Sequence, residues 1–211
     1  MDSRLVAWAR QVKARKPRRP GIGAASLQRR LPVLWLFTDW ARLPDPLPAI
    51  ARLPVGLCGV VFRHDAAPNR AALAQQVARL CRARRTALVV AGHPRLAAAA
   101  GAGVHLRDGW RGRLALPVAQ ILTSSAHDRI SLLRAKRNGA EVVFLSPLFP
   151  TASHPDAPAL GPLRWSCIAR HGTAPGHRTE VYALGGVSGS SARRVPGAAG
   201  GAGAISAAIG L

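Results

Sequence analysis

The sequence contains few acidic residues. Only nine of its 211 residues are Asp or Glu, against 30 Lys and Arg, which leaves a formal net charge of +21. Such a balance favours partners that carry phosphate, whether a small phosphorylated substrate, nucleic acid or an anionic membrane surface. Charge alone does not choose among these partners.

Cysteine is also scarce. Cys58, Cys81 and Cys167 form no Cys-x-x-Cys pair and have no histidine at the spacing of a metal site. Neither a zinc site nor a disulfide framework is therefore indicated. We interpret the three residues as small core side chains of a protein in the reducing cytosol.

Long hydrophobic runs are missing as well. No apolar stretch approaches the ~20 residues that a membrane-spanning helix requires, so we expect no membrane span and a cytoplasmic location. The length suits a single domain, since domains peak at ~100–150 residues and α/β barrels reach ~250.

The first 31 residues are basic and contain a single acid, Asp2. Apolar residues among positions 5–12 can form one face of a short helix, which Pro17 and Pro20 would end. We predict a basic N-terminal arm over 1–31, either disordered or a short helix, followed by a barrel domain over 32–211. The arm also resembles an organellar targeting segment, or one that binds nucleic acid or acidic lipid.

From residue 33 onward, segments typical of strands and of helices alternate. This alternation predicts βαβ units and a parallel sheet. The predicted strands are 33–38, 57–62, 87–90, 103–106, 118–123, 141–146, 181–184 and 202–206, and the helices between them include 69–84, 126–138, 162–171 and 189–195. The pattern predicts an α/β fold of the compact (β/α)8 TIM barrel type. A doubly wound sheet is the alternative.

The segment 144–161, FLSPLFPTASHPDAPALG, joins an apolar run to a polar loop. Pro147 and Pro150 lack a backbone N–H, so the strand is expected to stop before them. Thr151, Ser153 and His154 then lie beyond the carboxyl end of a strand, where α/β folds bind ligands. A proline-rich surface turn is the alternative.

Two later strand ends predict a phosphate site. Gly185 and Gly186 end the seventh strand and allow close backbone approach. Ile205 and Ser206 end the eighth strand and open a helix, whose free N–H groups suit a phosphate. The loops after strands 7 and 8 are the usual phosphate site of such barrels. Two ordinary glycine turns would give the same pattern.

These segments resemble the thiamine phosphate synthase and thiazole tautomerase family. The matching pieces are LWLFTD (34–39), VFRHD (61–65), GAGVHL (101–106), SSAHD (124–128), SPLFPTASHPDAPALG (146–161), ALGGV (183–187) and GAISAAI (203–209). The resemblance implies a (β/α)8 barrel that joins an aminopyrimidine diphosphate to a phosphorylated thiazole and releases pyrophosphate with Mg²⁺.

The resemblance also implies roles for single residues. It assigns Arg63 and Ser125 to the pyrophosphate and Thr151 and Ser153 to the thiazole, with His154 where the family has a lysine. It assigns Gly186, with the neighbouring Gly185, and Ile205 and Ser206 to the thiazole phosphate. Stabilising the charge of a leaving group is the main requirement of such a reaction.

Two acids that hold magnesium in the synthases are replaced in this sequence. The Asn-Asp pair expected after the third strand is Ala91-Gly92, and the Asp expected after the fourth strand is Trp110. Asp65 and Asp108 are the possible substitutes, because Mg²⁺ needs one or two carboxylates besides substrate phosphates and waters. Mg²⁺ is thus the expected cofactor of a true synthase, and no cofactor is expected otherwise.

The tautomerase branch offers a second interpretation, since its reaction needs no metal. A histidine after the fifth strand is its acid and base, and His127 occupies that position; histidine is suited to proton transfer near neutral pH. A third hypothesis is a non-catalytic protein that binds a phosphate ligand or, through its basic arm, nucleic acid.

Overall fold

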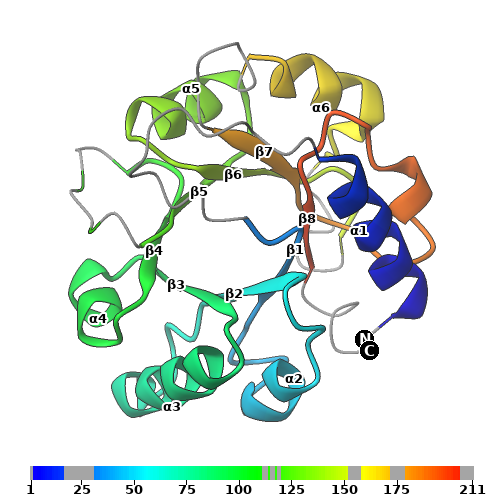
Figure 1. Cartoon of the computed structure of the whole chain (residues 1–211). Helices are drawn as coiled ribbons and strands as arrows, with labels where there is room; N and C mark the ends of the chain where they lie inside the picture. Colours follow the sequence, from blue (N-terminus) through cyan, green and yellow to red (C-terminus); the bar gives the residue numbers. More distant parts are fainter. Residues whose placement is uncertain are drawn as a thin grey trace, which may run out of the picture.

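Eight parallel strands close into a barrel in the part of the chain that the computed structural model describes (Figure 1). The described residues are 2–16, 31–110, 114, 117, 120–151, 158–171 and 179–204. The strands are β1 (Leu34–Phe37), β2 (Cys58–Phe62), β3 (Ala87–Ala91), β4 (Gly103–Leu106), β5 (Leu122–Ala126), β6 (Val142–Leu145), β7 (Glu180–Ala183) and β8 (Ala202–Ala204). Each strand pairs with the next, and β8 pairs with β1. The predicted (β/α)8 barrel is confirmed.

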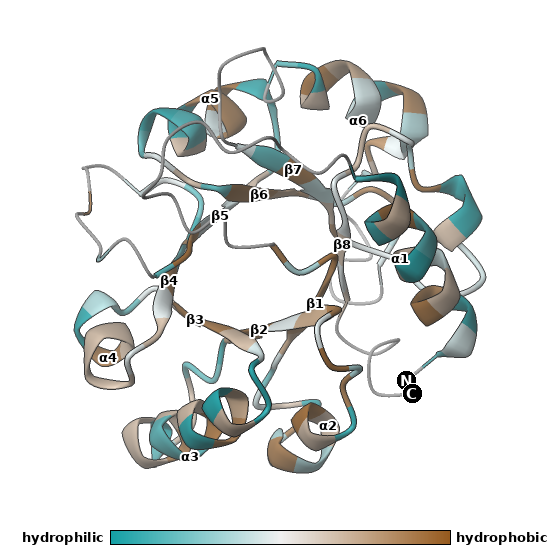
Figure 2. Cartoon of the chain, viewed as in Figure 1, coloured by the Kyte–Doolittle hydropathy of each residue, from teal (hydrophilic) through white to brown (hydrophobic). Residues whose placement is uncertain are grey.

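Helices surround the barrel on its outside (Figure 1). They are α1 (Ser3–Arg15), α2 (Leu47–Ala51), α3 (Arg70–Ala83), α4 (Pro94–Ala99), α5 (Arg129–Arg137), α6 (Gly161–Ala169) and the 3₁₀ helix η1 (Ala192–Arg194). Figure 2 shows largely hydrophobic strands, whereas the helices mix hydrophobic and hydrophilic residues. This is the expected colouring where each helix buries one side against the barrel wall. None of the helices described is long and apolar enough to cross a bilayer.

Four of the ten aromatic residues of the chain pack together inside the barrel. Phe144 is the centre of this cluster, with its ring centroid 5.8 Å from Trp35, 4.8 Å from Phe37 and 5.8 Å from Tyr182, all edge to face. Such pairs contribute about 0.5–1.5 kcal/mol each beyond the burial of their area. A second apolar cluster fills the space between the barrel wall and the helices. The interior is thus a packed core, and the reactive groups lie at its rim.

Two elements differ from the sequence prediction. The fifth strand was predicted over 118–123, but β5 spans Leu122–Ala126, so Ser124 and Ser125 lie within the strand instead of in the loop after it. The helix predicted over 189–195 is the single 3₁₀ turn η1. The first error has a physical reason. The interior positions of β5 are hydroxyl residues that bond a buried histidine, and a polar run of this kind gives no apolar signal for a strand.

Helix α1 packs against the barrel through Leu5 and Ala9, which are both buried. Its N-cap, Asp2, accepts hydrogen bonds from the N–H groups of Arg4 (2.9 Å) and of Gly189 (2.8 Å), which lies in the loop after β7. Beyond its other end, the ammonium group of Lys16 bonds Glu180, the first residue of β7. Helix α1 therefore runs antiparallel to β7, as the outer helices of such barrels do.

Candidate functional site

The carboxyl ends of the strands bring polar residues to one face of the barrel, which is where barrels of this type form their sites. Thr38 and Asp39 follow β1 and Arg63, His64 and Asp65 follow β2. Arg107 and Asp108 follow β4, and Thr151 lies in the segment after β6.

Arg63 is held by the end of the neighbouring strand. Its Nη2 lies 2.8 Å from Oδ2 of Asp39, and its backbone N–H donates to Oγ1 of Thr38 (3.0 Å). Burial would raise the pKa of Asp39, but the hydrogen bond and the charge of Arg63 lower it below its usual range. The pair is therefore ionised at neutral pH, and the guanidinium has a fixed direction.

His64 continues this network into the protein. The Oγ1 of Thr38 lies 2.8 Å from Nδ1 of His64, and Nε2 of His64 lies 2.9 Å from the carbonyl oxygen of Leu43. Since a carbonyl oxygen only accepts, Nε2 carries the hydrogen and Nδ1 accepts from the Thr38 hydroxyl. Burial lowers the pKa of His64, so the imidazole is neutral and acts as a structural link.

Asp65 lies between two arginines. Its Oδ1 is 2.9 Å from Nη2 of Arg70, and its Oδ2 bonds Nη2 of Arg107. Arg70 also donates to the carbonyl oxygen of Ala91, the last residue of β3 (2.8 Å). The ends of β2, β3 and β4 are therefore joined by charged groups, and Arg107 is the most exposed of them, with 57% of its side chain accessible.

His105 is buried inside the barrel, directly below this edge. Its Nδ1 lies 2.8 Å from Oγ1 of Thr123, and its Nε2 lies 2.9 Å from Oγ of Ser125. Burial, with the charges of Arg63 and Arg107, lowers the pKa of His105 to about 3. The imidazole is therefore neutral, and it fixes the hydroxyl of Ser125 at the mouth of the barrel.

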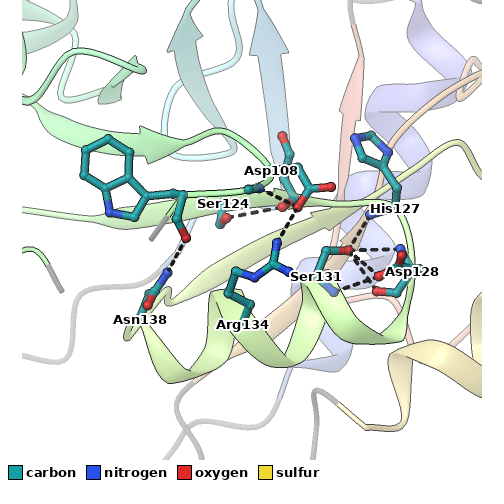
Figure 3. Close-up of polar contacts among 10 residues, drawn as sticks. Asp108, Ser124, His127, Asp128, Ser131, Arg134 and Asn138 are labelled. Carbon is teal, nitrogen blue, oxygen red and sulfur yellow. Dashed lines mark hydrogen bonds and ion pairs between the residues drawn. The ribbon is translucent and has the colours of Figure 1, made fainter. Parts of the chain in front are cut away.

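His127 lies at the start of α5, between β5 and β6. Asp128 caps this helix, accepting from the N–H of Ser131 at 2.7 Å, and Figure 3 shows the His127 ring pointing away from the helix. Nδ1 of His127 lies 3.0 Å from the carbonyl oxygen of Ser146. The carbonyl fixes the hydrogen on Nδ1, so in the neutral ring Nε2 carries the lone pair.

The segment after β6 lies against the end of β7. The N–H of Leu148 donates to the carbonyl oxygen of Leu184 (2.8 Å), and that of Phe149 donates to Gly185 (3.1 Å). Gly185 and Gly186 have φ values of +91° and +65°. A Cβ at Gly186 would meet Pro150 O and Phe149 Cβ at 2.6 Å, and one at Gly185 would meet the Thr151 methyl group at 3.2 Å. Both positions therefore require glycine.

The structure thus brings some of the predicted site residues together. Thr151 lies beside Gly185, and Arg63 and Ser125 both lie close to His105. His127 lies beside Ser146, at the base of the loop that leads to Thr151. Ser153, His154, Ile205 and Ser206 lie outside the described residues.

In the part of the chain that the structure describes, the carboxylates at this face do not fit a magnesium site. Asp39 pairs with Arg63, Asp65 pairs with two arginines, and Asp108 pairs with Arg134 at 3.5 Å (Figure 3). Magnesium takes carboxylates whose charge is free to neutralise the ion, whereas these are already neutralised by guanidinium groups. Within the described ranges, no three Asp, Glu, His or Cys residues lie close enough together to hold a metal ion. Asp65 and Asp108 are in separate ion pairs.

Sequence reasoning did not identify Arg70 or Arg107 as site residues. For Arg107 a signal was present, because it follows the last residue of a predicted strand, where a cation faces the site. For Arg70 there was none, because the sequence does not show which polar groups it meets.

Comparisons with known proteins agree with this fold. Residues 49–209 match the model of the family described as thiamine monophosphate synthase. The thiamine-phosphate synthase of Geobacillus kaustophilus is 34% identical over 133 residues, which are 60% of this chain and 58% of that protein. The match thus spans less than two thirds of that relative's length.

A solved structure shows the same architecture over a longer stretch. The thiamine phosphate pyrophosphorylase from Pyrococcus furiosus superposes with a TM-score of 0.67 at 25% identity, covering 84% of this chain and 87% of that one. The family model covers well over half of the chain, and the resemblance seen in the sequence motifs is confirmed. The chain belongs to the thiamine monophosphate synthase family.

Proposed function

We propose that this protein binds a phosphorylated thiazole at the carboxyl-end face of its barrel, as part of thiamine biosynthesis. The observation that carries this proposal is the position of Thr151 beside Gly185, where a Cβ on the glycine would lie 3.2 Å from the Thr151 methyl group, together with the left-handed backbone of Gly185 and Gly186. Backbone N–H groups at such a turn can approach a phosphate closely, and the hydroxyl adds a further donor.

The proposal is tested by calorimetric titration of the full chain with thiazole phosphate. Binding near one equivalent is expected, and Thr151→Val should weaken it because the hydroxyl is lost while the shape is kept. A titration without heat, together with an unchanged melting temperature, would remove the proposal.

The synthase reaction is the activity that the family implies. Here Arg63 would bind and orient the diphosphate of the second substrate, and Ser125, fixed by His105, would donate a hydrogen bond to the same group. These contacts stabilise negative charge on a leaving group. Formation of thiamine phosphate from aminopyrimidine diphosphate and thiazole phosphate, assayed with Mg²⁺ and with a chelator, tests this activity.

A tautomerase-like reaction is the second candidate, and the geometry of His127 favours it. The carbonyl of Ser146 holds the hydrogen on Nδ1, so Nε2 has the lone pair that a general base needs. Exchange of ring protons in a thiazole carboxylate phosphate should then persist in chelator and be lost in His127→Ala. Unchanged exchange in that variant would exclude the role of His127.

The hypothesis of a binder that uses the basic arm for nucleic acid stays a prediction. In the structure, two cations of this segment bond the barrel itself: Lys13 donates to the carbonyl oxygen of Gly56 and Lys16 to Glu180.

A further inference from the structure

Three arginines gather at the carboxyl ends of β2 and β4. We call Arg63, Arg70 and Arg107 the arginine cluster. Two carboxylates, Asp39 and Asp65, hold it in place. Three guanidinium groups against two carboxylates leave an excess of one positive charge at this edge.

The members of the cluster differ in exposure. The side chain of Arg70 is only 19% accessible and lies between Asp65 and the carbonyl oxygen of Ala91, so it supports the edge from below. The side chains of Arg63 and Arg107 are 38% and 57% accessible. Both lie near enough to His105 for their charges to lower its pKa. Arg107 bonds Asp65, which lies two residues after Arg63, so both arginine side chains lie at the same edge of the barrel and are partly open to solvent.

Gly92 makes room for Arg107. It follows β3 with φ at +65°, and a Cβ at this position would lie 2.7 Å from Nε and 3.2 Å from Cζ of Arg107. The guanidinium thus occupies the volume that any side chain at position 92 would need. The observed position of Arg107 therefore depends on the absence of a side chain at position 92, after the end of β3.

We propose that Arg63 and Arg107 form a diphosphate-binding site that needs no divalent cation, with the Arg107 guanidinium supplying the positive charge at the end of β3. This proposal rests on the proposed function, in which a diphosphate substrate occupies this face. Guanidinium groups are suited to the role, because each offers paired N–H donors that match the oxygens of a phosphate group and remains charged at any physiological pH. Asp39 and Asp65 fix the two arginines, so little side-chain freedom is lost when the anion binds.

The test is calorimetric titration of the full chain with inorganic pyrophosphate, in a chelator and in Mg²⁺. We expect binding near one equivalent in chelator, with an affinity within about threefold of that in Mg²⁺, and at least about tenfold weaker binding by Arg107→Ala. The affinity of Arg107→Lys for pyrophosphate should lie between those of the parent protein and Arg107→Ala, since lysine keeps the positive charge but lacks the paired N–H donors of the guanidinium. Arg79→Ala is the matched control, because it removes the same charge from the exposed outer face of α3 and should bind as the parent protein does.

Three results would overturn the proposal. They are binding that requires Mg²⁺, binding by Arg107→Ala that equals that of Arg79→Ala, and binding of many equivalents to the basic surface. Gly92→Ala gives a second measure, since its Cβ displaces Arg107: it should weaken pyrophosphate binding while thiazole phosphate binding at β6 and β7 is retained. If the protein binds pyrophosphate in chelator but does not bind thiazole phosphate, the proposed function is removed and this site is retained. If it binds thiazole phosphate but does not bind pyrophosphate in chelator, this site alone is removed.

Discussion

The Nε2 atom of His105 lies 2.9 Å from the Oγ atom of Ser125, inside the barrel and below the arginine cluster. The rings of Phe37 and Phe144 contact the same imidazole, and Thr123 bonds its other nitrogen. A histidine so enclosed stays neutral well below the pH at which an exposed histidine is protonated, since burial and two nearby arginines bring its pKa to about 3.

The enclosure of His105 predicts a loss of stability in mild acid. Between pH ~6.5 and ~3 the unfolded chain binds a proton at this residue and the folded chain does not, so the free energy of unfolding falls as the pH is lowered. From pH 7 to pH 5 the loss from His105 is about 2 kcal/mol. Urea unfolding of the parent protein and of His105→Gln at both pH values measures it, and the variant should show the smaller loss. His64, whose pKa is also lowered by burial, contributes a loss of the same sign, but it contributes equally in both proteins and so does not affect the comparison. Equal losses would contradict the prediction.

The hydroxyl of Thr38 has two partners, and removing it should be costly. In Thr38→Val the N–H of Arg63 and Nδ1 of His64 both lose their bond at a buried position, which we expect to lower the free energy of unfolding by about 2–4 kcal/mol. Thr38→Ser keeps the hydroxyl and removes one methyl group, for a cost of about 1 kcal/mol. Urea unfolding at neutral pH compares them, and a similar cost for both would show that the two hydrogen bonds contribute little.

Gly186 should tolerate no side chain. In Gly186→Ala the Cβ would meet Phe149 and Pro150 at 2.6 Å in a left-handed conformation, so we expect a cost above about 3 kcal/mol and weakened binding of thiazole phosphate. Gly139→Ala is the control, because Gly139 has a φ of +83° with no atom within 4 Å of its added Cβ, and it should lose only about 1 kcal/mol. Thermal unfolding and calorimetry measure both effects. Equal costs would mean that the loop moves to relieve the contact.

Asp2 caps α1 and also holds the loop after β7. In Asp2→Ala the N–H groups of Arg4 and Gly189 lose their acceptor, and the cost should be about 2 kcal/mol. Asp45→Ala removes a comparable local bond, to the N–H of Leu47 at the start of α2, and should cost about 1 kcal/mol less. Urea unfolding gives both values, and a cost for Asp2→Ala no larger than that for Asp45→Ala would show that the bond to Gly189 adds no stability.

The sequence was sufficient to predict the barrel, because parallel strands covered on both faces are apolar at every position. Residues 58–62 and 142–145, for example, are buried throughout. The fifth strand was misplaced because its interior residues, Thr123 and Ser125, face His105 instead of an apolar neighbour. The hydrophobic pattern of a sequence identifies strands that are buried against apolar side chains. It misses a strand whose polar side chains form hydrogen bonds with a buried polar residue.

The candidate site was predicted only in part for a different reason. Gly185, Gly186 and Thr151 lie next to strand ends that the sequence marks with glycine and proline, so their meeting follows from the order of the strands. The arginine cluster depends on which way Arg107 turns over Gly92, and that direction is set by packing. The resemblance to metal-dependent relatives drew attention to the missing acids. The structure shows that Arg107 lies beside Gly92, where one of those acids was expected.

Helix α1 has a consequence for the order in which the protein is assembled. Its contacts with Gly189 and Glu180 join residues separated by 187 and 164 positions. On the ribosome, these two bonds at the ends of α1 cannot form until the seventh strand and its following loop have emerged. Until then, the apolar side of α1, with Leu5 and Ala9, stays open to water or to chaperones. Complete docking of this helix therefore depends on contacts of very long sequence separation, and such contacts slow folding.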